Sequence, residues 1–134
     1  MWAAGIDLRT KMSEHSQIET QMKNRFSFLL ESGFCYEYTY EKGGDSSCVY
    51  IHRFKKGADR IDFREVSGGE ELNVMVYRGG EYRFPDIYAD YKKETLSFKL
   101  RHLFRKASKE ERFDFLATLI SRECEKGELF GIKL

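Results

Sequence analysis

The chain has 134 residues, of which 41% are hydrophobic, 15% are aromatic and one is proline, a composition that excludes disordered, collagen-like and low-complexity chains. Its length fits one domain with its own core. The 23 basic and 22 acidic residues nearly cancel, so the whole-molecule field favours neither nucleic acid nor membrane. No run approaches the roughly 20 apolar residues of a membrane span, and no secretory signal pattern is present. We therefore expect a cytoplasmic protein with no membrane partner.

The first expected element is an amphipathic helix. Residues 1–12 have no periodic pattern and end in a second methionine, so we interpret them as an upstream extension or a segment left by cloning, before a single domain over 13–134. From Ser16 the pattern is helical, and Ser16 with Glu19 has the spacing of a capping box. Gly33 supplies a left-handed stop. The apolar residues of this helix are Ile18, Met22, Phe26, Leu29 and Leu30.

The middle third of the chain changes from a helical period to alternation, and turns rich in glycine divide it into short segments. Aromatic residues fill every second position of 34–40, which predicts a strand with one aromatic face. Further strands are expected over 48–54 and 60–66, and on both sides of the glycine pair at 79–80. Pro85 then ends the last strand, which makes it short and places it at an edge. The pattern predicts an antiparallel meander of four to five strands.

Two glycine pairs, at 68–69 and 79–80, fix the register of the strands that they connect, because a two-residue hairpin loop allows one alignment. The predicted facing residues are Phe63 with Val74, Ile61 with Val76, Asp62 with Met75, Arg60 with Tyr77, Tyr77 with Tyr82 and Val76 with Arg83.

The direction in which the strand 48–54 faces stays open at this point. Its loop to the next strand, within 56–59, has no fixed length, and a change of one residue turns every side chain to the other face. The residues on the core side are either Val49 and Ile51 or Tyr50 and Phe54.

Two helices are expected after Pro85. One runs from about Tyr91 to Lys106 with a narrow apolar stripe, and Ser108 with Glu111 opens another that stops at Gly127. The stripe of the earlier helix consists of Leu96, Leu100, Leu103, Phe104 and Ala107. The apolar tail 128–134 is expected to dock on the domain.

These elements predict an α+β fold, in which an N-terminal helix and two C-terminal helices pack on one face of the meander. The predicted core joins Ile61, Phe63, Leu72, Val74 and Val76 of the sheet to Phe26, Leu29, Leu116 and Ile120 of the helices.

Residues that could carry chemistry give no coherent site. The odd number of cysteines, Cys35, Cys48 and Cys124, favours reduced thiols, and a bridge from Cys35 to Cys48 would span too much of the strand. The histidines have no metal-ligand spacing. No nucleophile elbow, zincin helix or phosphate loop is present. We therefore expect no catalytic residue, no cofactor and no metal, and a protein that is not an enzyme.

The segment 92–106 is the strongest charge feature, with six basic residues and one acid, Glu94. On a helical wheel, Arg101 and Arg105 fall opposite the leucine stripe with Phe98 among them, while Lys99 and Lys106 lie on the flank. Such a basic face with one aromatic suits phosphate backbones or an acidic protein. The alternative is a solvated face whose charges pair with acids of the following helix, Glu110, Glu111, Asp114 and Glu125.

The predicted function is protein binding, to another protein or to a second copy in a homodimer. The candidate surface is the exposed sheet face or edge near Tyr77, Tyr82 and Phe84, because edge strands and exposed tyrosines favour association. The alternative function is nucleic-acid binding through the basic helix 92–106. The candidate residues for that helix are Phe98, Lys99, Arg101, Arg105 and Lys106.

The layout also resembles known families. The chain is similar to small bacterial α+β families, including several immunity proteins of polymorphic toxin systems, in its order of elements: a helix, the segment FLLESGF, four or five meander strands and two helices. The resemblance covers roughly Ser13 to Lys126. It implies a binding module with a protein partner and carries over no site residues. Many immunity proteins are markedly acidic, whereas the net charge of this chain is +1.

Overall fold

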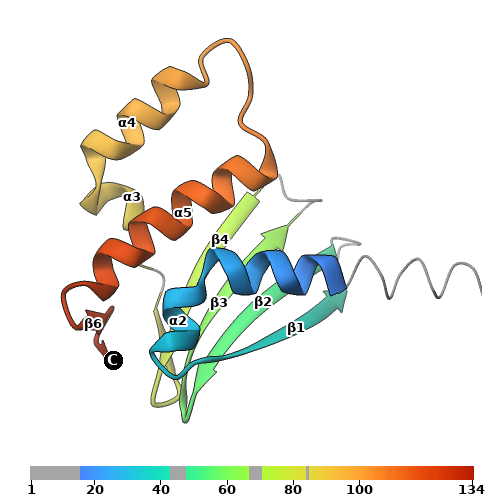
Figure 1. The fold of residues 1–134 in the computed structure, drawn as a ribbon, viewed down its shortest axis with the longest axis vertical. Coiled ribbons are helices and arrows are strands. Elements are labelled where there is room, and N and C mark those ends of the chain that lie inside the picture. The colour runs from blue at the N-terminus through green and yellow to red at the C-terminus, as the bar shows by residue number, and fades with distance from the viewer. Residues whose placement is uncertain (1–15, 43–47, 67–70, 84) are drawn as a thin grey trace, which may run out of the picture.

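The structure is a computed structural model that describes residues 16–42, 48–66, 71–83 and 85–134. A five-stranded antiparallel sheet forms its centre, with the strands in chain order (Figure 1). The α+β fold with a meander sheet is thereby confirmed. The strands are β1 (Cys35–Lys42), β2 (Cys48–Lys56), β3 (Asp59–Val66), β4 (Glu71–Arg78) and β5 (Glu81–Arg83).

The register predicted from the glycine pairs is confirmed. On β3 and β4, Phe63 faces Val74 and Ile61 faces Val76, although the loop at 68–69 lies outside the described residues. Tyr77 of β4 faces Tyr82 of β5. The turn between them places Gly79 and Gly80 at φ 59° and 93°, values that residues with a Cβ rarely adopt.

The turn between β2 and β3 settles which side of β2 faces the helices. Lys56 pairs with Asp59, so the loop has two residues, and Phe54 and His52 point toward the helices. Val49 and Ile51 point to the opposite face but are also buried. The pairing of β1 with β2 puts Cys35 opposite Lys55 and Cys48 opposite Lys42, at opposite ends of the strand pair.

The N-terminal helix has a break that the sequence pattern did not predict. Residues 16–25 are helical, Phe26 departs with φ −111° and ψ 34°, and α2 (Ser27–Glu31) follows. At this point Leu29 bonds back to the carbonyl of Phe26, a tighter i−3 hydrogen bond. Phe26 is fully buried, and its ring stacks on Phe63 of β3 at 4.4 Å between centroids. Gly33, at φ 98°, ends the helix as predicted.

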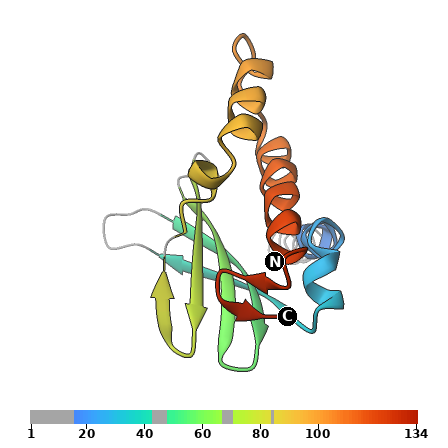
Figure 2. The same ribbon diagram turned by 90° about the vertical axis from the view of Figure 1, so that its left-hand side faces the viewer.

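The helix over 16–25 and α5 (Lys109–Cys124) lie on the same face of the sheet (Figures 1 and 2). The predicted capping box is present at the start of α5, between Ser108 and Glu111. The tail docks as expected, through the hairpin of β6 (Glu128–Leu129) and β7 (Ile132–Lys133). The predicted core residues form one buried cluster except Leu72 and Val74, which are partly buried and pack against it; α5 adds Phe113 and Leu119, and the tail adds Leu129 and Ile132.

The region between Pro85 and α5 differs most from the prediction. A short helix, α3 (Ile87–Asp90), precedes α4 (Lys92–Arg101), which ends five residues earlier than Lys106. α4 lies beside α5 and beyond the sheet (Figure 2). None of its residues is buried.

The predicted apolar stripe faces solvent, with Leu96 and Leu100 on α4 and with Leu103 and Phe104 just past its end. The exposed fractions are 59% for Leu96, 57% for Leu100, 65% for Leu103 and 101% for Phe104. The opposite side of α4 is turned toward α5, because Phe98 stacks there on Phe115. We name residues 87–108, which comprise α3, α4 and the connection to α5, the α4 arm.

The burial pattern predicts a large contrast between two leucine substitutions. Leu116→Ala on α5 should lower the free energy of unfolding by about 2–5 kcal/mol, because it opens a cavity in the core. Leu100→Ala on α4 should change it by less than about 0.5 kcal/mol, since the side chain is already in water. Urea denaturation of both variants measures the difference. A loss above about 2 kcal/mol for Leu100→Ala would contradict the exposed position of the stripe.

Candidate functional site

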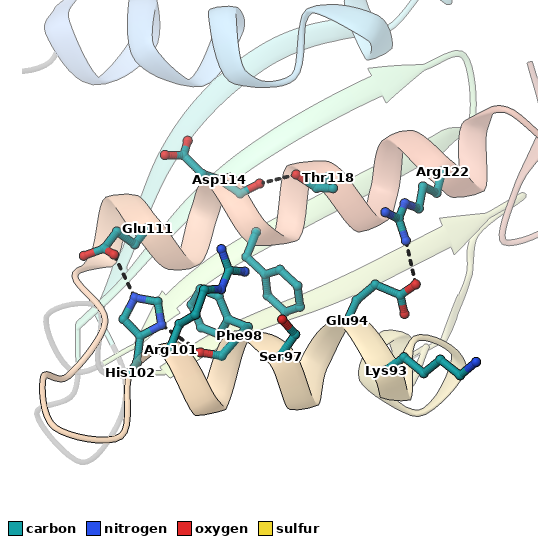
Figure 3. A pocket seen from close by; sticks show the side chains of 11 residues that line it. Lys93, Glu94, Ser97, Phe98, Arg101, His102, Glu111, Asp114, Thr118 and Arg122 are labelled. Atoms are coloured by element: carbon teal, nitrogen blue, oxygen red, sulfur yellow. Dashed lines mark hydrogen bonds and ion pairs between the residues drawn. The ribbon is translucent and has the colours of Figure 1, made fainter.

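Aromatic stacking sets the orientation of the α4 arm. The rings of Phe98 on α4 and Phe115 on α5 lie 4.4 Å apart at an interplanar angle of 7°. Tyr88 of α3 stacks near the same Phe115 ring at 6.2 Å and 19°. Phe98 therefore points toward α5 (Figure 3), and the residues on the other side of α4 point away from the molecule.

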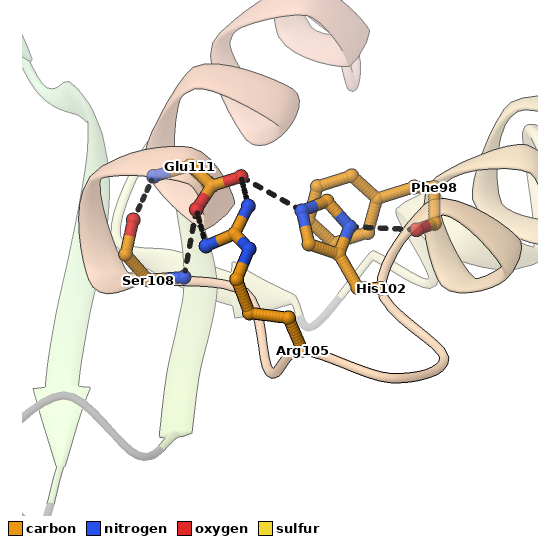
Figure 4. Close-up of polar contacts among 5 residues, drawn as sticks. All are labelled: Phe98, His102, Arg105, Ser108 and Glu111. Carbon is orange, nitrogen blue, oxygen red and sulfur yellow. Dashed lines mark hydrogen bonds and ion pairs between the residues drawn. The ribbon is translucent and has the colours of Figure 1, made fainter.

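A polar cluster fastens the end of α4 to the start of α5 (Figure 4). The two terminal guanidinium nitrogens of Arg105, Nη1 and Nη2, donate to the Glu111 carboxylate at 2.9 and 3.0 Å. His102 contacts the same carboxylate through Nε2 at 2.7 Å and the Phe98 carbonyl through Nδ1 at 2.8 Å. Hydrogen bonds hold the pKa of Glu111 well below its usual range. The largest effect comes from Arg105, followed by His102 and the backbone N–H of Ser108. Glu111 thus joins three segments of the chain.

A second ion pair connects the other end of α4 to α5. Arg122 of α5 donates to the Glu94 carboxylate at 2.7 Å. Glu94, the single acid within 92–106, points toward α5 (Figure 3). The outward side of α4 therefore carries no acid.

The solvated-face interpretation of the basic segment is only partly correct. Arg105 does pair with Glu111 of the following helix, as that interpretation expects. Within the described part of the chain, however, no ion pair forms for Lys92, Lys93, Lys99 or Lys106. Arg101 lies 6.0 Å from the ring of Phe98. Most of the cations on the arm are thus available to a partner.

A cleft of about 530 Å³ runs between α4 and α5 (Figure 3). Lys93, Arg101 and Arg122 line it together with an equal number of acids, Glu94, Glu111 and Asp114. This balanced lining gives no strong preference for an anion or a cation. The cleft between the two helices is therefore no strongly charged site, and no residue of the leucine stripe lines it.

The outer face of α4 combines an apolar row with cationic flanks. Leu96 and Leu100 stand at i and i+4 on α4, and Leu103 and Phe104 extend the row just after the helix ends. At about 100° per residue, Lys92 and Lys99 lie along one side of the row. Lys93 borders the row near Leu100, whereas Arg101 lies toward α5, near the ring of Phe98. We name Leu96, Leu100, Leu103 and Phe104 the leucine row.

The predicted site residues fall into two separate groups. At the sheet edge, Tyr77 is covered by the guanidinium of Arg60 at 3.8 Å, and its ring centroid is 6.0 Å from that of Tyr82, which is 60% exposed. Phe84 lies outside the described residues. On the arm, Phe98 is half-buried against α5, so the interpretation of it as part of an exposed face is wrong. Lys99, Arg101, Arg105 and Lys106 are exposed.

Sequence reasoning missed a buried polar cluster on the helix-facing side of the sheet. The ring of His52 is 1% exposed, with Nδ1 3.0 Å from the hydroxyl of Tyr36 and Nε2 in contact with the carboxylate of Glu65. Lys109 of α5 reaches the second oxygen of Glu65 at 3.0 Å. These residues come from β1, β2, β3 and α5, so the cluster connects the sheet to the helix that covers it.

The hydrogen bonds of this cluster are internally consistent. With a proton on Nε2, His52 donates to Glu65 and accepts from the Tyr36 hydroxyl. Burial raises the pKa of Tyr36, which keeps that proton in place. Burial also opposes the charge on Glu65, but hydrogen bonds from His52 and Lys109 outweigh it and lower the pKa below 4.5. A satisfied network of this kind holds the fold together.

Comparisons of the chain with family models, with curated proteins and with solved structures gave no match. Its function must be inferred from its own residues. Within the described ranges, no group of three or more His, Cys, Asp or Glu side chains is placed to hold a metal ion. No helix found there combines the length and apolar character that crossing a membrane requires.

The buried carboxylate of Glu65 predicts a specific dependence of stability on pH. Its folded-state pKa is lowered, so its contribution is present above about pH 4.5 and is lost as the pH falls through the folded value. Glu65→Gln should therefore cost about 2–4 kcal/mol at pH 7, and this difference from the parent should shrink on acidification. Denaturation between pH 3 and 7 measures it, with the exposed Glu81→Gln as the matched control. A difference that stays constant with pH would contradict the ionised, hydrogen-bonded state of Glu65.

Proposed function

We propose that this protein is a non-catalytic binding module that holds another protein through the outer face of the α4 arm. One observation carries the proposal. Four large apolar side chains, the leucine row, stand between 57% and 101% exposed on one projecting segment, two of them on α4 and two just past its end. Contiguous exposed apolar groups of this kind mark interaction surfaces, whereas isolated ones are ordinary.

The packing of α4 supports this use of its surface. α4 adds no buried residue to the core, so its leucines do not stabilise the domain. Yet the helix is held firmly, by the Phe98 stack in its middle and by ion pairs toward both ends. A helix that is already fixed loses little conformational freedom when a partner binds.

The remaining parts of the proposal rest on sequence features. Cys35 and Cys124 are free, in keeping with the reducing cytoplasm in which we place the protein. The similarity in layout to immunity proteins is in keeping with a protein partner. The tyrosine edge at Tyr77 and Tyr82 is a second proposed contact, for which the exposure of Tyr82 is the support.

Nucleic-acid binding through 92–106 is the alternative function. Lys99 and Lys106 favour it, because neither forms an ion pair with another described residue and such cations attract phosphates. Two observations weigh against nucleic-acid binding. Arg105 is held by Glu111, and the leucine row separates the cations on the two sides of α4. A charged phosphate backbone would make no favourable contact with that apolar row.

Photo-crosslinking in living cells tests the proposal. A photoreactive amino acid in place of Leu100 should yield an adduct with one discrete protein. The same amino acid in place of Glu110, exposed on α5, should not yield it. Leu96→Ser with Leu103→Ser should remove the adduct, since both apolar contacts are lost. An adduct with nucleic acid, or equal yields from positions 100 and 110, would contradict protein binding by the leucine row.

A further inference from the structure

We propose that the partner contributes an acidic amphipathic helix, which pairs lengthwise with α4 along the leucine row. This inference rests on the proposed function and specifies the chemistry of the partner. Three features of the leucine row support it: its extent along α4, its narrow width and the charges beside it.

The spacing and width of the row fit one helix. Leu96 and Leu100 lie one turn apart on α4, and Leu103 and Phe104 extend the row just past the end of the helix. Lys92 and Lys93 border the row directly, so the apolar band is only one side chain wide. Such a narrow band is typical of a seam between two helices, whereas a helix lying in a membrane surface buries a broad apolar face.

The charges beside the row determine the kind of helix. Lys92 and Lys99 occupy the flank at a spacing of seven residues, where they would meet the flanking residues of a paired helix. Lys93 also borders the row, whereas Arg101 lies toward α5. None of these four residues forms an ion pair with another described residue, and the nearby acid, Glu94, is bound to Arg122. Acidic residues on the partner would complement Lys92, Lys93 and Lys99.

The same charges disfavour a second copy of this chain. Two α4 helices paired along their leucine rows in the antiparallel sense would bring lysine opposite lysine, and like charges at such positions are destabilising. An acidic helix of another protein would instead place carboxylates opposite these lysines, and each such contact is attractive. The arrangement therefore selects against self-association.

The length of α4 sets the strength to expect. Its 10 residues span about 15 Å at 1.5 Å per residue. A single short helix pair falls among the small, transient interfaces. We therefore expect micromolar affinity that weakens with salt, because the flanking contacts are exposed to solvent.

Synthetic helical peptides test the inference with the full chain. All carry leucine at the a and d positions, and the flanking positions hold glutamate in one peptide and lysine in the other. By fluorescence anisotropy, the glutamate peptide should bind at least about tenfold more tightly than the lysine peptide, a preference that the three flanking lysines would produce. Leu100→Ser should abolish binding of the glutamate peptide.

A charge-reversal variant provides the decisive comparison. Lys92→Glu with Lys99→Glu should reverse the preference toward the lysine peptide. Lys55→Glu with Lys133→Glu changes the net charge equally at exposed positions away from the arm and should leave the preference intact. Circular dichroism of both variants confirms that each is folded.

Several results would overturn the inference. One is equal binding of the two peptides, or an unchanged preference after charge reversal. Another is a dimer in light scattering that Leu100→Ser dissolves, which would identify a second copy as the occupant. Sedimentation with phosphatidylserine vesicles that depends on Leu100 would identify a membrane surface instead. If position 100 still crosslinks to a protein in any of these cases, protein binding stands and only the acidic-helix chemistry fails.

Discussion

The stack of Phe98 on Phe115 decides which side of α4 meets the rest of the molecule. Aromatic pairs in parallel contact at 4.4 Å gain both buried area and a preferred ring geometry, so one such contact can orient a ten-residue helix. Once Phe98 points inward, the helical period turns the leucine row outward. The exposed leucines and their cationic borders, from which the proposed function is drawn, both depend on this orientation.

Glu111 makes that orientation compatible with the start of α5. The same carboxylate closes the capping box with Ser108 and accepts hydrogen bonds from Arg105 and His102. The cations near the tip of the arm are thus divided between two tasks. Arg105 serves the fold, whereas Lys99 and Lys106 stay free, a division that a count of charges along the segment does not reveal.

Local patterns were enough to predict the elements that local geometry controls. The register across the glycine pairs follows from two-residue loops, and the capping box at Ser108 follows from residue spacing. The outward leucine row could not be predicted, because amphipathic periodicity shows that α4 has an apolar side but not whether a neighbour covers it. The contact of His52 with Glu65 needed the β2–β3 register, which fixes them as diagonal neighbours on one face.

The position of α4 beyond the sheet explains why an apolar surface can persist on this fold. A leucine row over the sheet would have been covered by the core, whereas α5 is long enough to carry α4 past the sheet on one of its sides. The lysines that border the row oppose its self-association, since repulsion between cations hinders pairing of two copies. The leucines and lysines of α4 therefore act together, the first supplying attraction and the second restricting which partner receives it.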